Sequence, residues 1–255
     1  MMNEKSVLVL KIGGNQVEDE DFLAGFVAAV KGLLADHTVV VVHGGGKEIA
    51  DLHNQLGVSF ETIEGLRATS EESLRLVEMV LNGVVNTRLV RNLVNGGVDA
   101  VGLSGVDLGL VRVTPLSVNG RSLGRVGAVQ RVNGEALLQL LDTGITPVIS
   151  PVSLGEDGLS YNVNADHVAA GVARAVEAAR LVFVSNVPGV QVTSRTMRAL
   201  TVKQIEGLIA DGHITGGMIP KVRSATEAVL SGVYQAVITD LAGLAKDGGT
   251  AIIKG

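Results

Sequence analysis

The chain has 255 residues, enough for one large α/β domain or for two lobes around a sizeable core. Aliphatic side chains must form that core, because hydrophobic residues make up 46% of the sequence and aromatic residues only 2%. The net charge of −5 and the few aromatics argue against nucleic-acid binding, and the lack of cysteine excludes disulfides, thiolate metal sites and a cysteine nucleophile.

Apolar, strand-like runs alternate with helical stretches along the chain. The expected strands are 6–11, 38–42, 99–103, 146–150, 181–184, 236–238 and 251–253, and the expected helices are 21–34, 47–56, 69–95, 134–142, 165–178, 202–210 and 218–230. This order predicts a mostly parallel sheet with helices on both faces. Residues 110–132 alternate and contain three glycines, which predicts a β-hairpin flap.

The longest expected helix, 69–95, has its start signal in Thr69 and Glu72, which fit a capping box. Gly83 lies inside this helix, where it costs about 1 kcal/mol relative to alanine. A glycine there favours close packing, so the helix is either a subunit contact or an ordinary core helix.

The amino-terminal residues lead into a strand and not into a signal-like apolar segment. No apolar run approaches the roughly 20 residues that a membrane helix needs. We therefore expect a soluble, cytoplasmic protein without a membrane partner.

Three expected strands end in glycine-rich turns, which are Lys11-Ile12-Gly13-Gly14, His43-Gly44-Gly45-Gly46 and Ser104-Gly105. Glycine lets the backbone approach a ligand closely, and a strand that ends in glycines before a helix directs several N–H groups into one crevice. The turns therefore predict a phosphate or carboxylate ligand at the carboxyl edge of the sheet.

Several familiar nucleotide and hydrolase signatures are absent. Gly44-Gly45-Gly46-Lys47 is followed by Glu48 and lacks the leading glycine of a P-loop. The sequence contains no G-x-G-x-x-G, no G-x-S-x-G and no H-E-x-x-H. A lone histidine is more often structural than a metal ligand.

Four polar features stand out by context. Lys11 ends a buried strand, and Lys221 begins a helix after Gly216-Gly217. A bound phosphate would compensate both charges, whereas the alternative is a lysine that extends to solvent. The Asn162-Val163-Asn164-Ala165-Asp166 run has more polar residues than capping requires. Arg67 either binds a carboxylate or is solvated in a loop.

Together these residues resemble the amino acid kinase family, and within it the branch that phosphorylates N-acetyl-L-glutamate in arginine biosynthesis. The resemblance covers nearly the whole chain, in order. It is carried by Lys11-Ile12-Gly13-Gly14, His43-Gly44-Gly45-Gly46, Gly65-Leu66-Arg67, Val77-Glu78-Met79-Val80-Leu81, Gly102-Leu103-Ser104-Gly105, Asn162-Val163-Asn164-Ala165-Asp166 and Gly217-Met218-Ile219-Pro220-Lys221.

The resemblance implies a three-layer α/β/α sandwich around a mostly parallel sheet, in two lobes. Residues 1–178 would form an N-terminal lobe for amino-acid binding and dimerisation, and residues 179–255 a C-terminal lobe for ATP. Family members hold Mg²⁺ through the nucleotide phosphates and have no dedicated metal site in the protein.

The resemblance also implies roles for individual residues. Lys11 and Lys221 would stabilise the transferring phosphoryl group, and Asp166 would orient both lysines. The acyl amino acid would be held by Gly44, Gly45, Arg67, Asn162 and Asn164. The phosphate oxygens would accept hydrogen bonds from Gly13, Gly14 and Gly45, and the ATP side would include Asn186, Val187, Pro188, Gly189, Val190, Gln191, His213, Ile214 and Thr215.

Arginine-inhibited members of the branch have an additional helix before the first strand, and only five residues precede Ser6 here. The resemblance therefore implies a homodimer without a ring-forming helix. Two other functions remain open: a kinase for carrier-linked 2-aminoadipate or glutamate, and a non-catalytic sensor on the same fold. Four flap arginines (Arg112, Arg121, Arg125, Arg131) would suit an acidic carrier.

Overall fold

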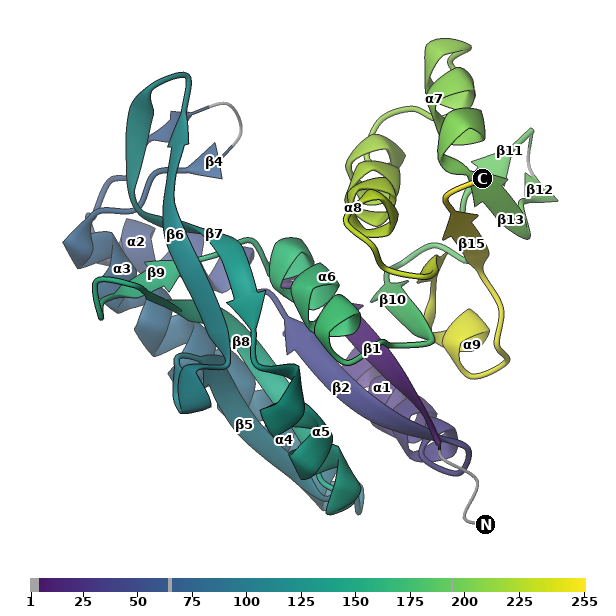
Figure 1. The fold of residues 1–255 in the computed structure, drawn as a ribbon, viewed down its shortest axis with the longest axis horizontal. Coiled ribbons are helices and arrows are strands. Elements are labelled where there is room, and N and C mark those ends of the chain that lie inside the picture. The colour runs from purple at the N-terminus through teal and green to yellow at the C-terminus, as the bar shows by residue number, and fades with distance from the viewer. Residues whose placement is uncertain (1–4, 64–65, 194) are drawn as a thin grey trace.

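A mostly parallel sheet of 11 strands runs through the molecule (Figure 1). The computed structural model describes residues 5–63, 66–193 and 195–255. Their strand order is β13 (Ala199–Thr201), β15 (Thr250–Ile253), β14 (Ala236–Thr239), β10 (Arg180–Val184), β1 (Ser6–Ile12), β2 (His37–His43), β8 (Thr146–Gly155), β6 (Val111–Val118), β7 (Arg121–Val132) and β9 (Ser160–Asn162), with β5 (Ala100–Gly105) paired to β8.

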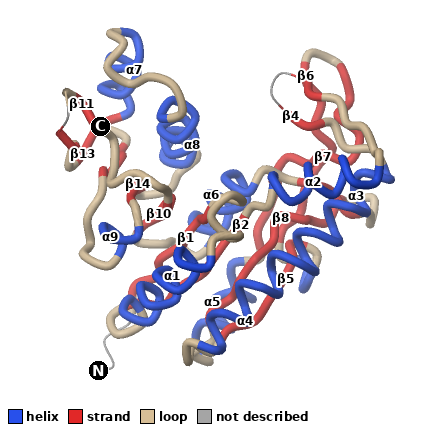
Figure 2. The backbone as a smooth tube through the Cα atoms, turned by 180° about the vertical axis from the view of Figure 1, so that it is seen from behind, coloured by secondary structure: helices blue, strands red, loops and turns tan. Residues whose placement is uncertain are grey.

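Helices cover both faces of this sheet. Several of the helices on one face lie in front in Figure 2. This face carries α1 (Glu20–Leu33), α2 (Gly46–Leu56), α9 (Leu241–Leu244) and one long continuous helix that consists of α3 (Glu71–Glu78), η1 (Met79–Asn86) and α4 (Thr87–Asn95). The other carries α5 (Gly134–Asp142), α6 (Ala165–Ala175), α7 (Val202–Ala210) and α8 (Met218–Leu230). The expected three-layer α/β/α architecture is confirmed.

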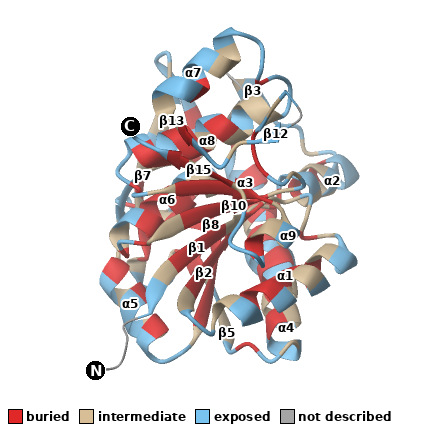
Figure 3. Ribbon diagram, turned by 90° about the vertical axis from the view of Figure 1, so that its right-hand side faces the viewer, coloured by how far each residue is buried: buried red, intermediate tan, exposed pale blue. Residues whose placement is uncertain are grey.

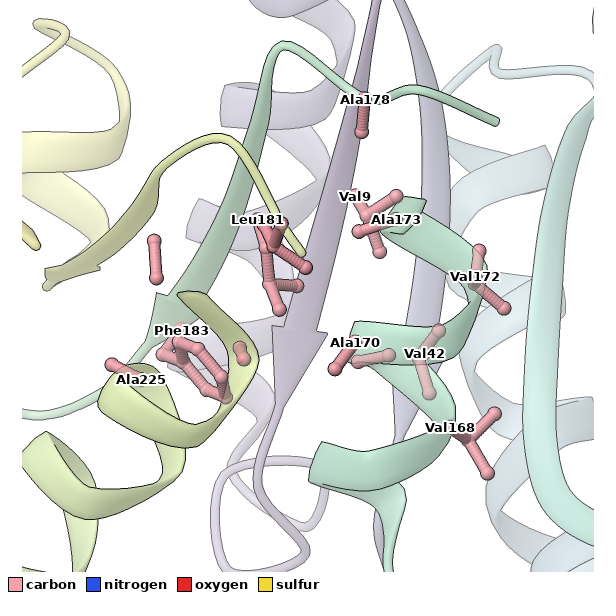
Figure 4. Packing of buried hydrophobic residues seen from close by; sticks show 14 of the residues in the cluster. Val9, Val42, Val168, Ala170, Val172, Ala173, Ala178, Leu181, Phe183 and Ala225 are labelled. Atoms are coloured by element: carbon pink, nitrogen blue, oxygen red, sulfur yellow. The ribbon is translucent and has the colours of Figure 1, made fainter. Parts of the chain in front are cut away.

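Alternating side chains of the central strands fill two separate cores. In β1, Leu8 and Leu10 pack with α1 and the long α3–η1–α4 helix, whereas Val9 packs with α6 and α8. Figure 3 shows the buried residues concentrated in the strands and in the helix sides that face them. Figure 4 shows small residues at the close contacts, with Ala173 of α6 beside Val9 and Ala225 of α8 beside Phe183.

The flap is a long β-hairpin, as the alternating sequence predicted. Strands β6 and β7 pair antiparallel and are joined at Asn119-Gly120, where both residues have positive φ (50° and 76°). Such a turn matches the right-handed twist of the flanking strands. Thr69 pairs with the flap through its backbone, since its N–H donates to Leu123 and its carbonyl accepts from Arg125.

The pairing of Thr69 corrects the expected start of the long helix. Ser70 is the N-cap of α3, and its side chain accepts a hydrogen bond from the Ser73 N–H. The middle of the helix, η1, is a π-helix that contains Gly83. Sequence periodicity predicted the helix but not this segment, because apolar spacing does not separate an α-helical turn from a π-helical one.

Short elements were not predicted, because segments of two or three residues leave no periodic signal. They include β3 (Thr62–Ile63) with β4 (Leu66–Arg67), β11 (Gln191–Val192) with β12 (Arg195–Thr196), the edge strand β13 and the 3₁₀ turn η2 (Asp107–Gly109). Gly65, one of the motif residues, lies outside the described residues. None of the helices that the structure describes is long and apolar enough to cross a membrane.

The topology changes direction at β1, and this positions the site. From β1 the sheet continues through β2 and β8 on one side and through β10 and β14 on the other, and the β10–β1–β2 pairings are parallel. Open α/β sheets bind ligands at the carboxyl ends of the strands beside such a switch point. Lys11 lies at this end of β1.

Candidate active site

A cavity of about 1150 Å³ opens at the carboxyl ends of β1, β10 and β14. It brings together eight of the residues singled out in the sequence: Lys11, Gly13, Gly14, Arg67, Asp166, Asn186, Val187 and Lys221. Its lining also contains Gly46, Lys47 and Met218, for which the sequence predicted no role in the site, and residues that it did not single out at all, among them Asn15, Gln16, Asp19, Phe22 and Ser224. The expected crevice at the sheet edge is therefore present.

Lys11 and Asp166 form an ion pair across the sheet edge. Lys11 Nζ lies 2.7 Å from Asp166 Oδ1, and their side chains are 18% and 19% exposed. Asp166 stands in the first turn of α6, which places a carboxylate beside the end of β1. The partly buried charge of Lys11 is thus compensated within the protein.

Lys221 is held differently. It stands in the first turns of α8, and its Nζ donates a hydrogen bond of 2.8 Å to Asn186 Oδ1. The pKa of Lys221 is lowered, chiefly by burial and further by the positive charge of Lys11. Two cations therefore influence each other in one cavity, which is the arrangement that a multiply charged anion can neutralise.

Asp166 contacts only one of the two lysines directly, among the ion pairs and hydrogen bonds of the described residues. Its second oxygen, Oδ2, accepts a hydrogen bond of 2.6 Å from Ser224 Oγ. Ser224 lies one turn beyond Lys221 on α8. The expectation that Asp166 orients both lysines stays a prediction, in which the acid contacts Lys11 directly and α8 through Ser224.

The glycine turns after β1 and β2 lie against each other. A Cβ on Gly14 would lie 2.7 Å from the Gly46 nitrogen and 2.8 Å from Gly45 Cα. No side chain caps the N-terminus of α2, so its free N–H groups add to the positive character of the cavity. At the start of α8 the Met218 and Ile219 N–H groups instead donate to the backbone oxygens of Thr215 and Gly216. The Gly13 N–H donates to Gln16 Oε1 at 3.0 Å.

Arg67 enters the cavity from β4. Its guanidinium carbon lies 4.0 Å from the centre of the Phe60 ring, and burial lowers the pKa of Arg67. Phe60 in turn contacts the buried His53 ring edge-on at 5.5 Å between ring centres. An arginine held by stacking keeps its N–H groups available for a carboxylate.

Four expected substrate residues do not line this cavity. Gly44 donates its N–H to Ile12 O, and a Cβ on Gly45 would lie 2.7 Å from Leu81 Cδ2, so this part of the turn serves packing. Asn162 donates to Thr69 Oγ1 at 3.3 Å. Asn164 caps α6 by accepting from the Asp166 N–H. This capping bond orients the helix turn that carries Asp166.

Of the nine residues that the resemblance places on the ATP side, Asn186 and Val187 line the cavity and the other seven do not. Gly189 has a φ of 146° and lies against Thr250. The Oγ1 atom of Thr250 accepts a hydrogen bond from the Val190 N–H. The remaining residues predicted there, Pro188, Gln191, His213, Ile214 and Thr215, lie away from the cavity lining. His213 and Ile214 donate their N–H groups to Leu208 O at the end of α7, and Ile214 is buried.

A buried polar pair lies behind the β2 turn. His43 is fully buried, its Nε2 lies 3.1 Å from Asn86 Nδ2, and its Nδ1 lies 3.1 Å from Gly44 O. Burial lowers the pKa of His43 to about 4, so the ring is neutral at pH 7 and accepts from Asn86. Asn86 also donates to Val148 O at 2.9 Å, which links η1 to two strands.

The described residues contain no group of three or more histidine, cysteine, aspartate or glutamate side chains arranged to hold a metal ion. The cavity's own charged groups are Lys11, Lys47, Arg67, Lys221, Asp19 and Asp166. Cations outnumber anions there, although the whole chain is acidic. The chemistry that this set favours is the binding and stabilisation of a polyanion.

Known proteins resemble this chain along its length. Acetylglutamate kinase of Chloroflexus aurantiacus is 51% identical over 251 residues, which cover 98% of each protein, and that of Methanopyrus kandleri is 42% identical over 252 residues, 96% of this chain and 99% of the other. The crystal structure of smu.665 from Streptococcus mutans is 31% identical with a TM-score of 0.82, and covers 98% of this chain and 99% of that one.

A carbamate kinase structure from Giardia is 19% identical, has a TM-score of 0.69 and covers 99% of this chain and 100% of that one, which extends the agreement in fold. The sequence pattern of the amino acid kinase family matches residues 6–240. With the paired lysines at the carboxyl edge of the sheet, this match makes the chain a member of the amino acid kinase family.

Proposed function

We propose that this protein transfers the γ-phosphoryl group of ATP to the side-chain carboxylate of N-acetyl-L-glutamate, giving N-acetyl-L-glutamyl 5-phosphate in arginine biosynthesis. The observation that carries the proposal is the cavity shared by Lys11, Asp166 and Lys221, in a chain 51% identical to an acetylglutamate kinase over 98% of both lengths. The family membership makes it a phosphotransferase, and the relatives supply the substrate.

The chemistry requires charge stabilisation more than proton transfer. A side-chain carboxylate has a solution pKa of about 4.3, so the acceptor is already a nucleophile at neutral pH. Phosphoryl transfer spreads negative charge over the equatorial oxygens of the migrating group, and fixed cations lower that barrier. Lys11 and Lys221, which enter the cavity from β1 and α8, supply this charge.

Binding roles follow from position in the cavity. Arg67, oriented by Phe60, holds a carboxylate of the acyl amino acid, and the Gly14 turn with the free start of α2 approaches the phosphate. Asn186, Val187 and Lys221 near the start of α8 accept ATP, because the Lys221 ammonium suits its phosphates. Mg²⁺ held by the phosphates would neutralise further charge.

The two substrates are assigned to the two lobes expected from the sequence. Residues 1–178 would bind the amino acid and dimerise, and residues 179–255 would bind ATP. The homodimer would form through η1, where Met79 and Val84 are 60% and 46% exposed and Gly83 has open space in front of it. Such a kinase would work in the cytoplasm, where ATP and biosynthetic intermediates are available.

The carrier-linked alternative depends on free arginines in the flap. Two of the four flap arginines are paired within the chain: Arg121 with Glu61 at 3.0 Å and Arg125 with Glu71 at 2.7 Å. This pairing reduces the positive surface that an acidic carrier would need. The sensor alternative would not require the Lys11, Asp166 and Lys221 constellation, which the chain retains.

One assay separates these possibilities. Purified protein with ATP and Mg²⁺ is offered free N-acetyl-L-glutamate, free L-glutamate or carrier-linked glutamate, and ADP release is followed. Hydroxylamine is added to trap an acyl phosphate as the hydroxamate. We expect hydroxamate and ADP in equal amounts with N-acetyl-L-glutamate. Turnover only with the carrier-linked substrate, or with none of the three, would contradict the proposal.

A further inference from the structure

Ser224 joins the acid of the site to the helix that carries Lys221. Its Oγ donates to Asp166 Oδ2 at 2.6 Å, while Asp166 Oδ1 faces Lys11 at 2.7 Å. The distance of 2.6 Å is typical of a hydrogen bond from a hydroxyl to an ionised carboxylate, which is stronger than a neutral one. One carboxylate thus contacts β1 with one oxygen and α8 with the other.

The beginning of α8 is held by two backbone hydrogen bonds, from Met218 N–H to Thr215 O and from Ile219 N–H to Gly216 O, and by apolar packing. Gly216 and Gly217 precede the helix, and no side chain caps it. The Lys221 ammonium contacts the neutral Asn186 amide and forms no ion pair within the described chain. The position of Lys221 therefore depends on how α8 lies against α6, and Ser224 is one turn away from it on the same helix.

The hydrogen bond also lies in the wall between two cavities. Asp166 and Ser224 line both the large cavity and a second one of about 270 Å³ between α6, α8 and β7. The second cavity is polar at its rim, with His167, Arg174 and Glu227. Loss of the hydroxyl would open the back of Asp166 to water from that side and weaken its hold on Lys11.

We propose that Ser224 is a positioning residue for phosphoryl transfer, which fixes the spacing of the two lysines by tying α8 to Asp166. The inference rests on the proposed function for its kinetic consequence. Sequence reasoning gave no hint of it, because Ser224 and Asp166 are 58 residues apart.

The first test compares Ser224→Ala with Ser224→Thr, and uses Ser231→Ala as the matched control. Ser231 lies at the end of the same helix, lines the second cavity and donates to Ala228 O without contacting Asp166. We expect kcat for Ser224→Ala to fall about tenfold with KM values nearly unchanged, because one charge-assisted bond is lost. Thr restores activity and Ser231→Ala keeps it. A Ser224→Ala enzyme with wild-type kcat would overturn the proposal.

The second test asks whether Ser224 acts through Asp166. In an Asp166→Ala background, Ser224→Ala should cause no further loss of kcat, since the acceptor is already gone. A purely structural serine would lower thermal stability and would lower kcat by the same factor in both backgrounds. An undiminished loss in the Asp166→Ala background would therefore contradict the assigned role.

A third readout does not depend on turnover. Amide hydrogen exchange at the start of α8, residues 217–221, should be faster in Ser224→Ala than in wild-type protein and in Ser231→Ala. Equal rates in all three would overturn the inference. If wild-type protein fails to phosphorylate N-acetyl-L-glutamate, the proposed function fails alone, and the exchange rates still decide whether Ser224 fixes α8.

Discussion

Lys11 and Lys221 differ in how the protein compensates their charge. Lys11 has a carboxylate partner, Asp166, at 2.7 Å, whereas Lys221 contacts, among the hydrogen bonds and ion pairs of the described residues, an amide oxygen and has a second cation nearby. Burial and the charge of Lys11 lower the pKa of Lys221, which disfavours its charged form. An anion placed between the two lysines would favour that charged form again.

Replacing Lys11 by methionine removes a charge while keeping an unbranched side chain. We expect kcat with N-acetyl-L-glutamate to fall by about 10² to 10³, the usual cost of losing one group that stabilises a developing anion. ADP release under saturating ATP measures the change. Lys203→Ala, on the exposed side of α7, is the control and should leave kcat unchanged. A wild-type rate in Lys11→Met would mean that another cation performs the transfer.

His43 makes the stability of the fold depend on pH. Burial lowers its pKa from 6.5 to about 4 in the folded protein, and its nearest polar contacts, Gly44 O and Asn86, carry no charge. Between these two pKa values the unfolded chain binds a proton that the folded chain does not. The stability that depends on the neutral ring is complete above pH 6.5 and is lost as the pH falls towards about 4.

The expected size of this effect is about 3 kcal/mol at pH 4, since one pKa unit corresponds to roughly 1.4 kcal/mol. Urea unfolding of the wild type and of His43→Gln, followed from pH 7 to pH 4.5, isolates the contribution. Glutamine can keep both hydrogen bonds and does not titrate. The wild type should lose more stability over this range than the variant. Parallel pH profiles would show that His43 takes up its proton over the same pH range in the folded and in the unfolded protein.

At the scale of elements, the site is formed where two strand-to-helix turns touch. The β1–α1 turn contributes Gly14 and the β2–α2 turn contributes Gly45 and Gly46, with no space between them for a Cβ. The neighbouring atoms are backbone, which cannot rotate away as a side chain can. The glycines thus fix the separation of β1 from the free N-terminus of α2.

Gly14→Ala should force these turns apart while leaving the core of the fold intact. We expect kcat/KM to fall by about 10²-fold, the typical cost of displacing reacting groups by about 1 Å. Steady-state kinetics and circular dichroism report the two effects separately. Gly207→Ala is the matched control, because a Cβ at that exposed position on α7 would meet no atom within 4 Å. Similar losses in both variants would attribute the effect to glycine replacement in general.

The sequence predicted elements better than contacts between distant elements. Helices 134–142, 202–210 and 218–230 have the expected bounds, because their apolar spacing and flanking glycines are local signals. Lys11, Asp166 and Lys221 share one cavity as expected, because parallel strands and following helices bring their signals to one edge. Ser224 was missed because its partner, Asp166, is distant in sequence. Phe60 was missed because its partner, Arg67, stands on a strand of two residues, which leaves no pattern in the sequence.

For the molecule as a whole, the charged groups of the large cavity come from both proposed lobes, with Lys11, Arg67 and Asp166 in residues 1–178 and Lys221 in residues 179–255. Pairing of β1 with β10 makes the sheet continuous between these lobes, so the two proposed binding regions share one scaffold. None of the residues of η1 lines the cavity. A dimer contact there would cover apolar side chains on the outer side of η1 without touching the site.

That distinction gives the last prediction. Met79→Glu combined with Val84→Glu places two charges on the exposed face of η1, where a partner helix would otherwise bury both side chains. Light scattering should give twice the chain mass of 26.3 kDa for wild-type protein and the single mass for the variant, with kcat largely retained. Tyr234→Glu, at an 81% exposed position elsewhere, should remain dimeric. A double variant that stays dimeric would show that the dimer contact lies on another surface. A monomeric wild type would refute the dimer.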